Sequence, residues 1–68
     1  MCLAVPGQVV KIEGENAIVD YGGIRKHANV SFIECDPGDW VLVHVGFAIQ
    51  VIDEQEARDM YNLLAEES

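Results

Sequence analysis

Four side chains in this sequence could act as nucleophiles or metal ligands, and Cys2 is the most informative of them. A cysteine directly after the initiator methionine is small enough that Met1 is expected to be removed, which leaves a free α-amine on Cys2. At reference values that amine titrates at about pH 8 and the thiol at about pH 8.5, so each is a potential nucleophile or metal ligand. The alternative is a cysteine that lies by chance on an unstructured tail. Its position alone leaves both interpretations open.

The other three candidates are His27, Cys35 and His44. His44 stands within an apolar run, which favours a hydrogen-bonded interior histidine over a functional surface group when the residue is taken alone. Cys35 precedes a turn and is expected to be a simple small side chain, and His27 is expected to be solvated. The spacing of the two cysteines and two histidines matches no zinc motif.

A complete catalytic site is not visible in the sequence. Paired catalytic carboxylates, a nucleophile elbow and a glycine-rich phosphate loop are absent from its motifs. A chain of 68 residues also has little volume for a deep substrate pocket. A thiol enzyme that uses Cys2, alone or with Cys35, lacks a general base fixed by local spacing, although His44 could reach the thiol in three dimensions. We therefore expect a protein that is not an enzyme and that presents Cys2 to a partner.

The charge of the chain excludes several classes of partner. Twelve acidic residues against four basic ones give a net charge of −8, and six of the acids follow position 52. Such a field repels phosphate backbones and anionic headgroups, so neither nucleic acid nor a membrane is an expected partner, even though a small barrel could serve as a nucleic-acid platform. The N-terminus has no pattern of a signal peptide, and the expected location is the cytoplasm, with both cysteines as free thiols.

The pattern of apolar and turn residues predicts an all-β fold with one terminal helix. Strands are expected over residues 8–12, 17–21, 24–30, 40–45 and 48–52. Turns are expected at 13–16, at Gly22 and Gly23, and at 35–39, with a bulge or a close backbone approach at Gly46. Asp53 followed by Glu56 has the spacing of a helix cap, and Ala57, Met60, Tyr61 and Leu64 form one apolar stripe. These elements predict a single domain over residues 1–68, with a five-stranded OB-like barrel (about 1–52) and a helix (about 53–66).

The segment between Cys2 and the first expected strand is predicted to be held against the barrel. Leu3 and Val5 alternate with Cys2, and Pro6 with Gly7 is expected to form a turn into the strand. If Leu3 and Val5 face the barrel, the Cys2 thiol projects from the opposite face and is available to a partner.

Two segments, MCLAVPG at residues 1–7 and GDWVLVHVGFAI at residues 38–49, resemble the signatures of the HypC/HupF family of hydrogenase maturation chaperones. The first is specific because it is anchored to the terminus, and the second because of its length. The resemblance implies a scaffold protein of [NiFe]-hydrogenase assembly with an OB-like barrel and a C-terminal helix.

The resemblance also implies roles for individual residues and partners. Cys2 would contact iron as the Fe(CN)2CO unit, only transiently and in complex with a partner, with no nucleotide cofactor. The partners implied are HypD and the precursor of the hydrogenase large subunit. His44 becomes a candidate second metal ligand or partner contact, which reverses the interpretation of this residue taken alone. The expected partner-binding residues are Cys2, Leu3, Val5, Pro6, His44, Gly46 and Phe47.

Overall fold

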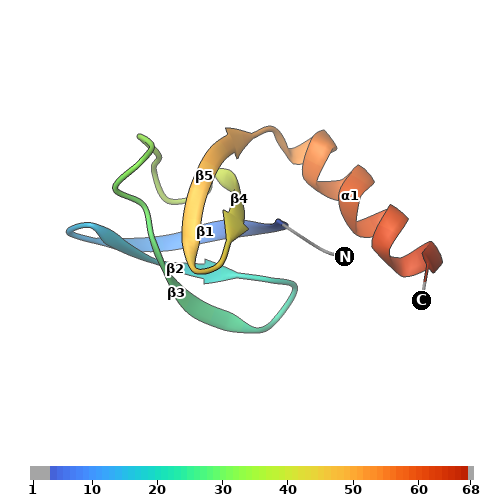
Figure 1. Ribbon diagram of the computed structural model, residues 1–68, viewed down its shortest axis with the longest axis horizontal. Helices are drawn as coiled ribbons and strands as arrows, with labels where there is room; N and C mark the ends of the chain where they lie inside the picture. The colour runs from blue at the N-terminus through green and yellow to red at the C-terminus, as the bar shows by residue number, and fades with distance from the viewer. Residues whose placement is uncertain (1–3, 68) are drawn as a thin grey trace.

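The structure is a computed structural model that describes residues 4–67, with side chains described as far as residue 62. Figure 1 shows a small β-barrel from which one helix extends. The elements are β1 (Val5–Glu13), β2 (Asn16–Asp20), β3 (Arg25–Asn29), β4 (Trp40–His44), β5 (Phe47–Ile52) and α1 (Glu54–Glu67). The predicted fold class, five strands followed by one helix, is confirmed.

The barrel closes in the strand order β1-β2-β3-β5-β4, with β4 pairing back onto β1. Four of the pairs are antiparallel, and β3 with β5 is parallel and paired at Asn29 and Phe47. Closure between β3 and β5 depends on this one residue pair, whereas the other strand pairs have four or five. The five strands therefore form the predicted OB-like barrel.

Strand β1 begins earlier than the sequence predicts. Pro6 and Gly7, expected as a turn, lie within β1 and pair with Leu42 and Val41. Gly7 is needed there because a Cβ at its position would lie 2.4 Å from Cγ1 of Val19 on β2. The predicted turn is wrong because this glycine serves a close approach between strands, which local turn propensity does not reveal.

The connection from β4 to β5 also differs from the prediction. Val45, expected as the last residue of a strand, has a φ of 52°, and Gly46 has a φ of 82°. The two form a tight turn between the paired residues His44 and Phe47, as a hairpin with two positive φ values requires. Val45 consequently lies at the surface rather than on the buried face of β4 with Val41 and Val43. The register of the β4–β5 pairing shifts between Leu42 and Val43, not at Gly46.

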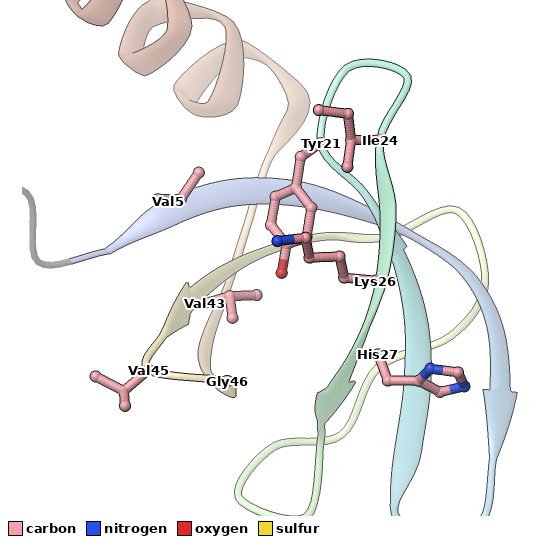
Figure 2. A pocket seen from close by; sticks show the side chains of 8 residues that line it. All are labelled: Val5, Tyr21, Ile24, Lys26, His27, Val43, Val45 and Gly46. Atoms are coloured by element: carbon pink, nitrogen blue, oxygen red, sulfur yellow. The ribbon is translucent and has the colours of Figure 1, made fainter.

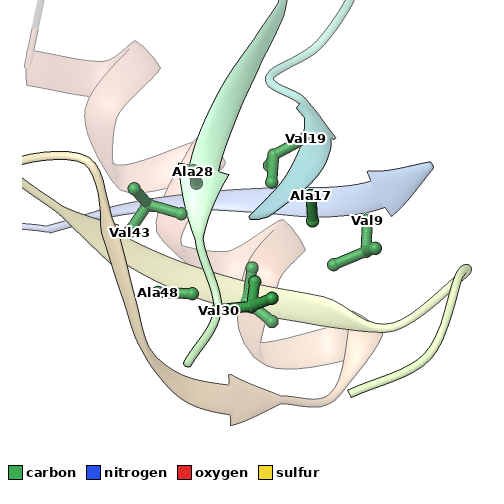
Figure 3. Packing of buried hydrophobic residues seen from close by; sticks show 8 residues of the cluster. Val9, Ala17, Val19, Ala28, Val30, Val43 and Ala48 are labelled. Carbon is green, nitrogen blue, oxygen red and sulfur yellow. The ribbon is translucent and has the colours of Figure 1, made fainter. Parts of the chain in front are cut away.

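The core is built almost wholly from small side chains. Figure 3 shows the buried cluster inside the barrel. Its members are Val9, Ala17, Val19, Ala28, Val30, Val41, Val43 and Ala48. Valine and alanine fill a barrel of this size without displacing the strands, because the interior of a small barrel has room for few large side chains. Val43, a member of this cluster, also lines the site described below.

Helix α1 begins at the cap that the sequence predicts. The backbone N–H of Glu56 donates to Oδ1 of Asp53 (2.7 Å), and the N–H of Asp53 donates to Oε1 of Glu56 (3.4 Å). This reciprocal pair satisfies two N–H groups that a helix start leaves without intrahelical partners. No helix in the described part of the chain is long and apolar enough to cross a membrane.

The helix is anchored to the barrel over β1 and β4. Ala57 is fully buried, and Met60 and Tyr61 are half-buried, as the predicted stripe requires; the side chain of Leu64 lies outside the described residues. The Tyr61 hydroxyl donates to the carbonyl oxygen of Pro6 (2.6 Å), and the Tyr61 ring meets Trp40 edge to face at 6.1 Å. The start of β1 is therefore fixed to the helix as well as to β4.

Candidate functional site

The end of the barrel at which β1 begins is the part of the structure closest in sequence to Cys2. Cys2 and Leu3 themselves lie outside the described residues. Val5, the first residue of β1, pairs with Val43, one residue before His44. Three residues of chain span at most about 11 Å, so the backbone of Cys2 is tethered within that distance of Val5. The described residue nearest to Cys2 in β1 thus lies at the barrel end where β4 turns into β5.

His44 is exposed at this same end. It is the last residue of β4 and pairs with Phe47 across the Val45–Gly46 turn. The interior role that the residue favours when taken alone is wrong, because the apolar run in which His44 stands ends in a turn and not in the core. Its imidazole lies at the surface, as a ligand or partner contact requires.

His27 lies on β3, and Cys35 lies in the connection between β3 and β4. His27 is exposed on β3, with Nε2 at 4.0 Å from Oε1 of Glu13. Cys35 is half-buried beside a hollow of about 520 Å³, and burial, together with the charges of Asp39 and Asp36, raises the pKa of its thiol. Since the thiolate is the nucleophile and the metal ligand, Cys35 is poorly suited to either role. Within residues 4–62, no three His, Cys, Asp or Glu side chains gather in a metal-binding group.

A groove of about 390 Å³ opens at the barrel end beside Val5, and we call it the barrel-end groove (Figure 2). It is lined by Val5, Tyr21, Ile24, Lys26, His27, Val43, Val45 and Gly46. Val5 and Gly46 were expected partner-binding residues, whereas the lining residues from β3, from the β2–β3 connection and from β4 and the turn after it (Val43 and Val45) were missed. These residues belong to separate elements that come together only when the barrel closes, so no local pattern in the sequence predicts that they share a groove.

The remaining expected partner-binding residues occupy different surroundings. Pro6 is buried, and its carbonyl is engaged by Tyr61, which suits a supporting role. Phe47 stacks on Phe32 with ring centroids 5.4 Å apart, and the two residues are 41% and 69% exposed. Large aromatic residues this exposed are typical of contact surfaces, and this pair lies next to the Val45–Gly46 turn.

Tyr21 contributes the hydroxyl of the barrel-end groove. Partial burial and the nearby Tyr61 raise its pKa, so the hydroxyl stays protonated at neutral pH. The Tyr21 hydroxyl makes no hydrogen bond with the other described residues, and Figure 2 shows this hydroxyl directed toward the interior of the groove. The groove therefore combines apolar walls with the Tyr21 hydroxyl and the Lys26 ammonium group, neither of which has a side-chain partner within the described chain.

Comparison of the sequence with known proteins identifies its family. The family model described as HupF/HypC matches residues 1–64, which include Cys2, His44 and the five strands. The chain belongs to the HupF/HypC family. The family predicted from the two sequence signatures is thus confirmed.

Individual relatives match nearly the whole chain. The hydrogenase maturation factor HypC of Escherichia coli K12 is 46% identical over 71 residues, covering 94% of this chain and 79% of the relative. HypC of a Synechocystis strain is 42% identical over 73 residues, covering 97% and 96%. The Frd operon uncharacterized protein C of Proteus vulgaris is 46% identical over 72 residues, covering 94% and 75%.

Proposed function

We propose that this protein is a non-enzymatic, cytoplasmic factor in [NiFe]-hydrogenase maturation that carries the Fe(CN)2CO unit on Cys2. It would bind HypD and the precursor of the hydrogenase large subunit in turn. Membership of the HupF/HypC family supports the proposal, since the match extends over the segment that contains Cys2. Relatives that are 46% and 42% identical to it over the aligned residues are named hydrogenase maturation factors.

One structural observation carries the assignment of Cys2 and His44 to the same site. Val5, three positions after Cys2, pairs with Val43, which directly precedes the exposed His44. A cysteine thiolate and a neutral imidazole are both good ligands for iron. We assign Cys2 as the principal ligand and His44 as a second ligand or hydrogen-bond donor, with the partner completing the coordination.

The supporting residues have distinct contributions in this proposal. Leu3 and Val5 orient the segment, and Pro6 is held by the hydrogen bond from Tyr61. Gly46 belongs to the turn that places His44 opposite Phe47, and the exposed Phe47 ring is a contact for the partner. The cargo would be passed between proteins without being changed, so the protein needs no catalytic group of its own.

The test compares the two cysteines of the chain. The complex with HypD is purified with wild-type protein, with Cys2→Ala and with Cys35→Ala, and its infrared spectrum is recorded. We expect the cyanide and CO stretching bands in the wild-type and Cys35→Ala complexes and their loss with Cys2→Ala. Undiminished bands with Cys2→Ala would show that the cargo is not held by this thiol.

A second pair of variants tests the histidine. His44→Ala should shift or weaken the same bands, whereas Lys11→Ala, which removes an exposed side chain of β1 outside the barrel-end groove, should leave them unchanged. Equal effects of the two substitutions would remove His44 from the proposed site.

A further inference from the structure

Lys26 occupies an unusual position for a charged residue. Across the β2–β3 pair, Ala17 is opposite Ala28 and Val19 is opposite Lys26. Paired residues of an antiparallel ladder project to the same face of the sheet, and the other three of these residues are in the core. Lys26 therefore takes the next inward position, where the barrel opens, and Figure 2 shows its side chain extending along the barrel-end groove.

The charge of Lys26 is not balanced by the described residues. The other three Lys and Arg residues have carboxylate partners: Lys11 with Glu13, Arg25 with Asp20, and Arg58 with Glu54. Lys26 forms no ion pair with any residue of the described chain. Among the described residues that line the groove none is acidic, although the protein has twelve acids and a net charge of −8. The groove is thus a local site of positive charge on an acidic protein.

Apolar side chains surround this charge. Val5 and Val43 form one wall, and Ile24 and Val45 stand at the rim with 63% and 80% of their surface exposed. Rim residues of this kind gain most when a partner covers them, because burial of apolar surface contributes about 25 cal/mol per Å². An ammonium group beside apolar walls is complementary to a segment in which a carboxylate adjoins an apolar side chain.

We propose that the barrel-end groove is the docking site for an acidic segment of the partner polypeptide, with an apolar side chain between Ile24 and Val45 and a carboxylate paired with Lys26. The inference rests on the proposed function, because Val5, which lines the groove, lies three positions after the cysteine to which that proposal assigns the cargo. Docking there would bring the partner's own ligands to the iron that Cys2 holds.

The first experiment measures the affinity of the full-length chain for purified HypD. Lys26→Glu reverses the charge in the groove, and Lys11→Glu makes the same change in net charge on the outer face of β1. We expect Lys26→Glu to weaken binding roughly tenfold or more, and Lys11→Glu to change it by less than about twofold. Both lysines are exposed, so both variants should fold, which circular dichroism verifies. Equal affinities of the two variants would overturn the docking site.

Photo-crosslinking identifies the occupant. A photoreactive amino acid replaces Ile24 at the groove, or Val10 on β1 as a control outside it. A crosslink from position 24, and not from position 10, to a HypD segment that contains Asp or Glu beside an apolar residue would support the proposal. A crosslink to a basic segment, to a second copy of this chain, or to nothing would overturn it.

The infrared measurement separates this proposal from the function on which it rests. At saturating HypD, the Lys26→Glu complex should keep its cyanide and CO bands, because Cys2 is intact. Retained affinity with Lys26→Glu refutes the docking site and leaves the role of Cys2 standing. Retained bands with Cys2→Ala refute the cargo role whatever the result for Lys26.

Discussion

The substitution Gly7→Ala tests the packing on which the start of β1 depends. A Cβ at this position would lie 2.4 Å from Cγ1 of Val19 and 3.0 Å from two ring carbons of Tyr21. Carbon atoms in contact prefer about 3.5–4.0 Å, so the new methyl group must displace side chains. Val19 is fully buried and has little freedom to move. The cost of such overpacking is about 1–3 kcal/mol.

A smaller effect opposes this cost. Gly7 does not have a positive φ, so alanine fits its backbone and lowers the entropy of the unfolded chain. That contribution stabilises the protein by roughly 0.4–1 kcal/mol. We therefore expect a net loss of about 1–2 kcal/mol, which for a domain of this size corresponds to a decrease in Tm of roughly 5–15 °C. Thermal and urea unfolding followed by circular dichroism measure it.

A double-mutant cycle shows whether the clash with Val19 is the cause. Val19→Ala removes the methyl group that the new Cβ at position 7 would strike, so Gly7→Ala should cost less than about 0.5 kcal/mol in that background. Val30→Ala, which shortens another buried valine that is not among the nearest neighbours of Gly7, should leave the cost unchanged. An equal penalty for Gly7→Ala in the Val19→Ala protein and in the wild type would refute the reasoning.

Two further predictions concern polar contacts. Tyr61→Phe removes the hydroxyl that donates to the Pro6 carbonyl and should lower the free energy of unfolding by about 1 kcal/mol in urea titrations. Tyr21→Phe removes a hydroxyl that makes no hydrogen bond within the described chain, so it should change the free energy of unfolding little. Equal losses for the two variants would show that the hydrogen bond to Pro6 does not stabilise the fold. The pKa of Asp20 is lowered chiefly by the Gly23 backbone N–H, which donates to Oδ1 at 2.6 Å. Because the lowered pKa belongs to the folded state, this contribution is complete above the usual Asp pKa of 3.8 and is lost as the pH falls through the folded-state value. Asp20→Asn, whose amide oxygen can still accept from Gly23, should therefore show a shallower decline of the urea midpoint below pH 4, and an unchanged decline would contradict the assignment.

Sequence by itself determined the features that depend on neighbouring residues. Asp53 and Glu56 cap the helix within four positions of chain, so their spacing was sufficient to place its start. The alternation of β4, with Val41 and Val43 inward, follows from a local period of two. The N-terminal position of Cys2 and the two family signatures also belong to the linear sequence. These are the parts of the fold and the site that could be predicted.

Features that require distant segments to meet were decided by the tertiary structure. Local sequence predicts that Gly7 lies in a turn, whereas in the folded chain Gly7 lies in a strand, where a Cβ would clash with Val19 and Tyr21. Val45 disfavours a positive φ because its side chain is β-branched, yet it adopts one in a turn whose next residue, Gly46, accepts a hydrogen bond from the N–H of Asn29 (2.8 Å).

The barrel-end groove exists for the same reason. Its residues come from β1, β4, the β4–β5 turn, β3 and the segment before β3. The pairing of Lys26 with Val19 sets this exposed lysine at the open end of the barrel. Local sequence specifies which face of its own strand a side chain occupies. Barrel closure decides which side chains of other strands it contacts there. It places Lys26, which has no ion pair among the described residues, next to the apolar side chains of Val5, Ile24, Val43 and Val45.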